Sequence, residues 1–411
     1  RCTEPWMSKT RSNLKRSISR TETNNQTNGN TNSRCIGCVR NRLERKIKLF
    51  MPRIEISLPQ IQDNARMLSQ LYGQKGISLM GVSKAVLGEP SIVKAMVQGG
   101  VRFIADSRIE NIEKMKAAGI STPFVLLRTP LSQAESVVRS ADISLNTELD
   151  TLKKLSYYAK ACNKNHQVIV MVELGDLREG VLPCDLSEFM RQTLSLSHIK
   201  IIGIGCNLAC YGGVKPADTN MHELSKLFDI LEKEFHLGLT IISGGNSANY
   251  EWYKSTKDLG NINNLRIGES ILLGRETVNR KAISGLHTGA FKLVAEVIES
   301  KKKPSLPFGE IGQDDFGNEP IFKDQGIHQR VIIALGKQDI LASSLKSNNG
   351  LEILGSSSDH IILDSKNNNL QIGDEVNFNL DYGCLLAAMT SPFIKKQFVD
   401  RNGHAAAECP D

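Results

Sequence analysis

From residue 77 onward, short apolar runs alternate regularly with segments of helical period, and this pattern constrains the fold most strongly. The run "ISLMGVSK" (77–84) precedes "PSIVKAMVQGG" (90–100), and the series ends with "LRIGESILLG" (265–274), giving about eight strands in roughly 230 residues. Strands that are apolar on both faces and joined by helical crossovers predict an α/β fold with a parallel sheet. Eight such strands favour a closed (β/α)₈ TIM-like barrel, with a doubly wound open sheet as the alternative.

The pattern changes after residue 282, where strand-like segments follow one another without helices. Examples are "QRVIIALG", "HIILD" and "DEVNFNL", separated by turns rich in Gly, Asn, Ser and Asp. We therefore predict a barrel over residues 51–282 and a C-terminal β-rich domain over residues 283–398.

The two ends of the chain differ from the rest in composition. Residues 1–50 hold 12 Lys or Arg against three Glu, a net charge of +9, whereas the remaining 39 basic and 41 acidic residues give −2. Because the excess basic charge lies in one Asn/Thr/Ser-rich segment, we predict a disordered leader rather than a nucleic-acid-binding protein. The leader could also be a transit peptide or an extension upstream of a natural start at Met51. Residues 399–411 are predicted to form an unstructured tail.

The chain has no run of about 18 apolar residues, which predicts the absence of a membrane span and favours the cytosol. Cys35 and Cys38 form a single CxxC pair without a second ligand pair, so no metal site is predicted.

Polar residues follow nearly every predicted strand, and in a barrel those positions share one cavity. They are Lys84, Asp106 with Arg108, Arg128, Asn146, Glu173 with Arg178, Asn207, Ser243 to Ser247, and Arg266. A lysine such as Lys84 at the end of an apolar strand is most often salt-bridged or snorkelling. The alternative is an amine that its surroundings keep partly deprotonated and that forms a Schiff base with a carbonyl.

Two neighbouring motifs suit a phosphorylated cofactor. In "SGGNSANY" two glycines and Ser247 lie between a strand and a helix, where backbone N–H groups and a hydroxyl can approach a phosphate. In "RIGESILLG" Arg266 lies at a strand end, and an arginine facing the pyridine nitrogen of pyridoxal phosphate would keep that nitrogen unprotonated. "GIGCNLACYGG" lacks the GxGxxG spacing of a nicotinamide site.

The ordered set GVSK, VELGDLREG, GCNLACYGG, SGGNSA, LRIGESILLG, SSSDH and DYGCLLAAMTSP resembles the alanine racemase superfamily of fold-type III pyridoxal-phosphate enzymes. It is most similar to the alanine/ornithine racemase branch, and the resemblance covers residues 51–398. It implies a pyridoxal-phosphate-dependent amino-acid racemase that forms a homodimer. A non-catalytic cofactor carrier and a fold-type III decarboxylase or aldolase are the alternatives.

The resemblance also implies roles for individual residues. Lys84 matches the Schiff-base lysine and Arg266 matches the arginine at the pyridine nitrogen. The groups that bind the cofactor phosphate in the family match Ser247, Tyr382 and the backbone of Gly268 and Glu269. Arg178 matches an arginine near the substrate carboxylate. Ser358 and Asp359 resemble a segment that the partner subunit contributes.

The chain departs from the family at two positions. Asn207 stands where alanine racemases have a histidine beside the cofactor. The segment "PFGEIGQDDFG" corresponds to the one that carries the opposing catalytic tyrosine, and it contains no tyrosine.

Racemisation needs proton transfer on both faces of Cα. Lys84 is expected to serve one face, and Tyr382, Asp314, Asp315 and His360 are candidates for the other, of which Tyr382 and Asp315 rank first.

The same segment suggests a substrate. Glu310, Asp314 and Asp315 could receive a distal ammonium group through charge-assisted hydrogen bonds. We therefore expect ornithine, or lysine, to be preferred over alanine.

Overall fold

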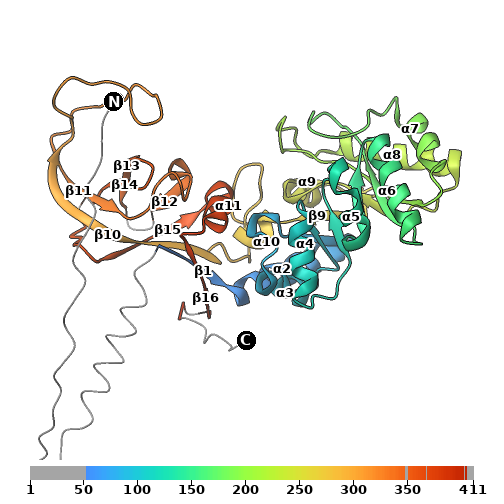
Figure 1. The fold of residues 1–411 in the computed structure, drawn as a ribbon, viewed down its shortest axis with the longest axis horizontal. Coiled ribbons are helices and arrows are strands. Elements are labelled where there is room, and N and C mark those ends of the chain that lie inside the picture. Colours follow the sequence, from blue (N-terminus) through green and yellow to red (C-terminus); the bar gives the residue numbers. More distant parts are fainter. Residues whose placement is uncertain (1–51, 348–349, 367, 402, 405–411) are drawn as a thin grey trace, which may run out of the picture. The chain divides into compact units, whose positions relative to one another are not determined.

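In the computed structural model, which describes residues 52–347, 350–366, 368–401 and 403–404, eight parallel strands close into a barrel (Figure 1). The strands are β2 (Ser78–Val82), β3 (Phe103–Asp106), β4 (Phe124–Leu126), β5 (Ile143–Asn146), β6 (His166–Met171), β7 (Ile199–Gly205), β8 (Ile241–Ser243) and β9 (Asn264–Ile267). β9 returns to pair with β2, from Ser78 opposite Asn264 to Gly81 opposite Ile267. The predicted barrel is confirmed, and the open sheet is wrong.

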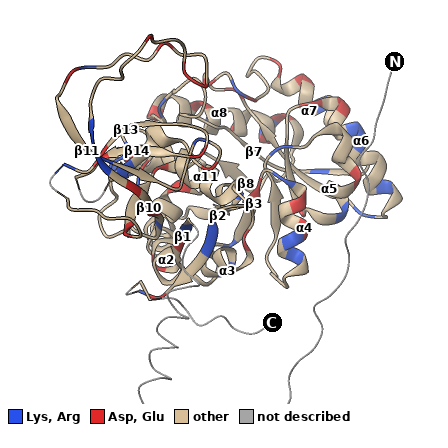
Figure 2. Cartoon of the chain, turned by 60° about the vertical axis from the view of Figure 1, so that its left-hand side comes forward, with Lys and Arg blue, Asp and Glu red and all other residues tan. Residues whose placement is uncertain are grey.

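Helices follow the strands in the order that the periodicity predicts. They are α3 (Pro90–Gln98), α4 (Ile109–Ala117), α5 (Ala134–Ser140), α6 (Leu149–Ala161), α7 (Leu186–Leu194), α8 (Asp218–Phe235), α9 (Tyr250–Ser255) and α10 (Glu269–Leu273); α2 (Leu58–Gly73) precedes β2. Lys/Arg and Asp/Glu are interspersed on these helices (Figure 2). Neither sign of charge dominates the helical layer that Figure 2 displays.

Two apolar layers explain why the strands read as continuous hydrophobic runs. The barrel interior is filled by a cluster made of Met80, Val82, Ala105, Val125, Ile143, Leu145, Ile169, Met171 and Ile202. Alternate residues such as Leu79, Ile104 and Val168 point the other way and join the large core that includes the helices. Both faces of each strand are therefore buried, as expected of a parallel sheet.

Gly203 lets β7 and β8 approach each other. It pairs with Ile241 of β8, and a Cβ atom at this position would lie 2.1 Å from the Ile241 carbonyl oxygen. Because real Cβ atoms do not come this close to backbone oxygen, any other residue would push the two strands apart.

The second domain is a mostly antiparallel sheet, as predicted. Its strands are β10 (Phe291–Pro304), β11 (Ile327–Ile333), β12 (Leu345–Ser347), β13 (Glu352–Ser356), β14 (Ile361–Asp364), β15 (Glu375–Leu380) and β16 (Lys395–Val399), and the main order is β12-β15-β10-β11-β14-β13. In β15, Val376, Phe378 and Leu380 are buried and alternate with more exposed residues. This period of two is typical of a sheet with one face in a core.

The first described strand, β1 (Arg53–Ser57), belongs to this second sheet. It pairs antiparallel with β10 and parallel with β16. Arg53 donates hydrogen bonds to Glu55 and Glu375, which ties the strand to β15 as well. The described part of the chain therefore starts in the β domain and enters the barrel through α2.

A short helix connects the β domain to the rim of the barrel. In α11 (Tyr382–Thr390) the Asp381 carboxylate accepts a hydrogen bond from the Cys384 backbone N–H at 2.9 Å, a normal N-cap. The helix packs against the turn η1 (Lys84–Val86) that follows β2. Tyr382, at the first position of α11, is thereby brought beside Lys84.

No helix in the described ranges is long and apolar enough to cross a bilayer. The predictions for the leader (1–50) concern residues outside those ranges, and so do the predictions for residues 405–411 of the tail.

Candidate active site

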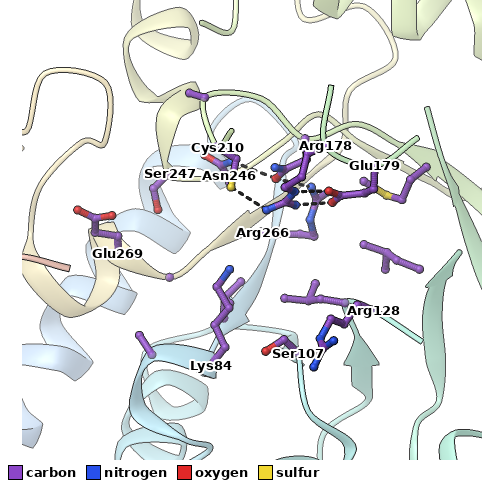
Figure 3. Close-up of a pocket in the computed structure, with 18 of the residues that line it drawn as sticks. Lys84, Ser107, Arg128, Arg178, Glu179, Cys210, Asn246, Ser247, Arg266 and Glu269 are labelled. Carbon is purple, nitrogen blue, oxygen red and sulfur yellow. Dashed lines mark hydrogen bonds and ion pairs between the residues drawn. The ribbon is translucent and has the colours of Figure 1, made fainter. Parts of the chain in front are cut away.

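A cavity of about 650 Å³ lies at the carboxyl ends of the barrel strands (Figure 3). All eight strands contribute to it, through Lys84 after β2, Ser107 after β3, Arg128 after β4, Asn146 of β5, Arg178 after β6, Asn207 after β7, Ser247 after β8 and Arg266 of β9. Tyr382 reaches it from α11. Because parallel barrel strands end at the same rim, residues far apart in sequence meet here.

Four of the polar residues expected at this rim do not line the cavity: Asp106, Arg108, Glu173 and Ser243. Asp106 is fully buried, and its carboxylate accepts hydrogen bonds from Ser83 Oγ at 2.6 Å and Asn111 Nδ2 at 2.9 Å. Burial raises the pKa of Asp106, and these hydrogen bonds oppose that shift. The carboxylate fixes the backbone immediately before Lys84.

Lys84 projects into the cavity from η1 (Figure 3). Among the described residues its amine has no hydrogen-bond or ion-pair partner. Burial lowers the pKa of the Lys84 amine, with Cys210 opposing the shift and Arg178 adding to it. A half-buried, unpaired amine of this kind is suited to nucleophilic or base chemistry.

Arg266 lies in the wall of the cavity and is 5% exposed. It donates from Nη1 to Ser243 Oγ at 2.6 Å and from Nη2 to the Cys206 carbonyl at 2.7 Å and to Asn207 Oδ1 at 3.3 Å. Its Nε has no partner among the described residues. Burial lowers the pKa of Arg266, so placing this guanidinium in the cavity wall costs solvation free energy.

A glycine turn and a hydroxyl form the wall between β8 and β9. Gly245 has φ +137°, and a Cβ there would lie 2.3 Å from Asn249 Oδ1. Ser247 Oγ accepts a hydrogen bond from the Ser270 backbone at 3.2 Å, which leaves its own proton available for a ligand. At Gly268 a Cβ would meet Val82 at 3.0 Å. The absence of side chains keeps backbone accessible beside the Ser247 hydroxyl.

The Glu269 carboxylate, next to this wall, is paired with Arg280 from the loop that leaves the barrel. Burial raises the pKa of Glu269, and Arg280 lowers it. Burial also raises the pKa of Tyr382 to about 12, and Glu269 adds to that shift. The Tyr382 phenol is therefore held protonated and can donate a hydrogen bond into the cavity.

Arg178 forms the opposite wall together with two neighbours (Figure 3). It makes a bidentate ion pair with Glu179 and donates from Nη1 to Cys210 Sγ at 2.7 Å. The loops that carry these residues are joined by Asp176, whose carboxylate accepts from the backbone N–H groups of Cys210 at 3.2 Å and Tyr211 at 2.9 Å. A cation is therefore fixed in this wall, facing the cavity.

Comparison with known proteins identifies the family. Residues 56–276 match the alanine racemase N-terminal domain. The chain is 44% identical to the ornithine racemase of Acetoanaerobium sticklandii over 85% of its own length and 99% of that protein. It is 38% identical to the lysine racemase of Thermotoga maritima over the same shares. The chain belongs to the alanine racemase family. It is a pyridoxal-phosphate-dependent amino-acid racemase.

Solved structures agree on the fold of the racemase. The alanine racemase of Bartonella henselae, solved with covalently bound pyridoxal phosphate, superposes with a TM-score of 0.66 at 20% identity. The match covers 85% of the racemase and 99% of that chain. Both the barrel and the β domain are therefore shared, and the resemblance stated from the motifs is confirmed.

The donor set of the racemase's cavity fits pyridoxal phosphate. The Arg266 Nε donor, which has no partner among the described residues, suits the pyridine nitrogen, and the Ser247 hydroxyl with the side-chain-free backbone at Gly268 suits the phosphate. The unpaired Lys84 amine suits the aldehyde carbon. Asn207 lines the same cavity, and its Nδ2 is buried without a partner.

Apart from Tyr382, the site residues predicted from the β domain do not line this cavity in one copy of the racemase. Asp314 lies in an exposed turn, where its carboxylate accepts hydrogen bonds from the backbone of Phe316 at 2.9 Å and Asn318 at 2.8 Å. Asp315 is exposed beside it. Ser358 and Asp359 lie in the exposed turn between β13 and β14, where Asp359 contacts His360 Nδ1 at 2.7 Å. Their assignment to a partner subunit's cavity stays a prediction.

Sequence reasoning missed several residues that line the cavity, among them Glu179, Cys210 and Arg280. None of them directly follows a strand, so the strand-end rule did not select them. Arg280 and Glu269 are separated by 11 positions, and Cys210 lies 32 positions beyond Arg178. Only the run of polar residues after β6 and β7, in "GDLREG" and "CNLACYGG", hinted that these loops face a ligand.

Proposed function

We propose that the racemase interconverts L- and D-ornithine by moving the proton at Cα, with Lys84 as the base on one face. The observation that carries this proposal is the Lys84 amine itself. It projects into the cavity, it has no partner among the described residues, and burial lowers its pKa, which favours the neutral amine relative to an exposed lysine.

In this proposal Arg266 meets the pyridine nitrogen of the cofactor, Ser247 and Tyr382 meet its phosphate together with the backbone of Gly268 and Glu269, and Asn207 lies beside its ring. Pyridoxal phosphate, when bound, withdraws electrons from the substrate Cα and so makes the Cα proton removable. The lowered pKa of Arg266 and its three hydrogen bonds support a guanidinium that stays fixed at the cofactor ring, where it would keep the pyridine nitrogen unprotonated.

Arg178 is proposed to receive the substrate carboxylate. Its guanidinium is fixed in the wall by Glu179 and Cys210, and an arginine holds a carboxylate in a defined plane. Lys84 would then remove or return the proton on the face of Cα that it approaches. Tyr382 and Asp315 stay predictions for the other face; the phenol of Tyr382, with a pKa of about 12, is a weak base there.

Support for ornithine comes from the two relatives that match over 99% of their length. One is an ornithine racemase and the other a lysine racemase, so both are named for amino acids with a distal ammonium group. The acidic residues Glu310, Asp314 and Asp315 suit such a group if the loop that carries them borders a cavity.

We propose that the loop meets the cavity of a second copy in a homodimer. Residues 305–326 join β10 to β11 and carry exposed apolar side chains: Phe308 is 92% and Ile321 97% exposed. Apolar side chains gathered in one exposed loop are typical of a protein interface. Ser358 and Asp359 would then serve the partner's site. The cytosol stays our prediction for the working compartment.

The substrate is tested by following deuterium exchange at Cα by NMR. Full-length protein with added pyridoxal phosphate is incubated in D₂O with L-ornithine, L-lysine, L-alanine or L-serine. We expect exchange with loss of optical activity, fastest for ornithine, and none for Lys84→Ala. Faster exchange of alanine than of ornithine would overturn the substrate, and cofactor binding without exchange of any amino acid would overturn the role of Lys84.

The dimer is tested by complementation. Lys84→Ala and Asp359→Ala proteins are each inactive if the site is shared, but a mixed dimer has one intact site. After subunits are mixed at random we expect about a quarter of wild-type activity, because half of the dimers are mixed. No recovery, or a monomeric mass by light scattering, would contradict the shared site.

A further inference from the structure

We propose that the Cys210 thiol is the second proton-transferring group of the racemase and acts on the face of the substrate Cα opposite Lys84. The inference rests on the proposed racemisation at Cα. It does not depend on which amino acid is the substrate.

The sequence lacks the residue expected to transfer a proton on the second face of Cα. A racemase requires a proton donor or acceptor on each face of Cα, and "PFGEIGQDDFG" offers no tyrosine. The cavity carboxylates are poor alternatives because Glu179 is paired with Arg178 and Glu269 with Arg280. Glu148 also lines the cavity, but it is not among the charged groups that act on the Lys84 amine.

Cys210 is held in place by hydrogen bonds rather than lying on a loose loop. Its backbone N–H and that of Tyr211 donate to the carboxylate of Asp176, which is fully buried. The Gly212 N–H donates to the Asp176 carbonyl at 3.0 Å, and a Cβ at Gly212 would lie 2.7 Å from that same oxygen. The loop after β7 is therefore fixed to the loop after β6, and the thiol points into the cavity (Figure 3).

The position of Cys210 relative to Lys84 suits a pair that acts from two sides. Figure 3 shows Lys84 rising from one wall and Cys210 facing it from the wall that also carries Arg178. Cys210 lines the same cavity as Lys84, Arg266 and Tyr382. A reacting carbon between Lys84 and Arg178 would have the sulfur on its far side.

The contact with Arg178 places the Cys210 sulfur beside the group that is proposed to bind the substrate carboxylate. Arg178 Nη1 lies 2.7 Å from Cys210 Sγ, and the same guanidinium is proposed to receive the substrate carboxylate. Substrate bound to Arg178 would therefore lie next to the thiol.

The proton transfers balance without an oxidant or reductant. In one direction the Cys210 thiolate takes the Cα proton, the C–H bond pair stays on carbon, and the Lys84 ammonium delivers a proton to the opposite face. In the other direction the neutral Lys84 amine takes the proton and the Cys210 thiol supplies one. Exchange with water restores the starting protonation of both groups.

The test compares Cys210→Ser with Cys184→Ser, a matched control because Cys184 is an exposed free cysteine that does not line the cavity. Each full-length protein, loaded with pyridoxal phosphate, is given L- or D-ornithine separately in D₂O. For Cys210→Ser we expect racemisation to fall by about 10²- to 10⁴-fold. Deuterium should still enter the one enantiomer whose proton Lys84 removes, without inversion, and exchange of the other enantiomer should be lost.

A second readout does not depend on turnover. In Lys84→Ala, which cannot racemise, iodoacetamide should modify Cys210, as followed by mass spectrometry, and ornithine should slow this reaction while leaving Cys184 unaffected. Cys210→Ala should behave as Cys210→Ser does, and circular dichroism confirms that both variants fold.

Three outcomes would overturn the proposal: exchange of both enantiomers by Cys210→Ser within a few-fold of wild type, no protection of Cys210 by ornithine, or one-sided exchange in Tyr382→Phe instead. If the wild-type protein exchanges alanine rather than ornithine, the substrate proposal fails separately. The same comparison with alanine then still decides the role of Cys210.

Discussion

The rim of the barrel and the loop of residues 305–326 carry similar charged side chains but hold them differently. At the rim, Arg266 is 5% exposed and makes three hydrogen bonds, and Lys84 is half-buried with no partner among the described residues. In the loop, Asp314 is satisfied by its own turn and Asp315 faces water. Charges interact strongly only where water is excluded, so the rim charges have such a setting within one copy, whereas the loop would gain it only against a second surface.

The largest expected effect tests the rim. Lys84→Ala should lower the rate of racemisation by at least about 10⁴-fold, because it removes both the attachment point of the cofactor and one base. Polarimetry with ornithine measures the rate. Lys94→Ala, which removes an exposed lysine of α3, should keep the wild-type rate, and an equal loss in both variants would mean that the effect is not specific to the rim.

The next effect is on stability. Arg266→Met should lower the free energy of unfolding by about 2–4 kcal/mol, since Ser243, the Cys206 carbonyl and Asn207 lose their buried donor. Urea denaturation of the cofactor-free protein measures it. Arg139→Met removes an exposed i,i+4 ion pair with Glu135 and should leave the free energy of unfolding almost unchanged. An equal loss of unfolding free energy in both variants would show that the hydrogen bonds of Arg266 at the rim stabilise the fold no more than an exposed ion pair does.

A smaller effect concerns the wall between β8 and β9, where Ser247 is proposed to meet the cofactor phosphate. Ser247→Ala should weaken pyridoxal-phosphate binding about 10-fold, because one hydroxyl donor to a charged group is lost. Fluorescence titration of the cofactor measures this. Ser255→Ala, an exposed serine of the neighbouring α9, serves as the control and should leave the affinity unchanged.

The loop itself is tested by two adjacent substitutions. Asp315→Asn should lower the preference for ornithine over alanine, measured as a ratio of kcat/KM values, by about 5- to 10-fold if the loop borders a partner's cavity. Asp314→Asn should mainly weaken the hydrogen bonds of its own turn. An unchanged preference in Asp315→Asn would remove the loop from the site.

The smallest effect is a change in pH dependence. The pKa of Lys84 lies below 10.5 in the folded protein, so between these two values the unfolded chain binds more protons than the folded one. The free energy of unfolding of the cofactor-free protein should therefore rise with pH across that window. Lys84→Met should remove this rise, as measured by urea denaturation at several pH values, whereas Lys94→Met should retain it.

Much of the barrel followed from local patterns. The apolar runs and helical segments between residues 77 and 274 predict the number and order of strands because both faces of each strand are buried. Lys84, Ser247 and Arg266 could be selected because the cavity of a barrel lies at the strand ends. The same rule wrongly included Asp106, whose side chain turns inward to fix Ser83 and Asn111.

The sequence by itself determined the class of fold, the family and the residues that suit a cofactor, because these depend on periodicity and on motifs within a few positions of a strand end. Only the tertiary structure decided that β1 joins the second sheet and that Cys210 meets Arg178 in the same cavity as Lys84. It also decided that the Asp314 carboxylate accepts hydrogen bonds from the backbone of its own turn. These are contacts between separate segments or choices of side-chain direction, and they are fixed by how the whole chain packs rather than by local residue preference.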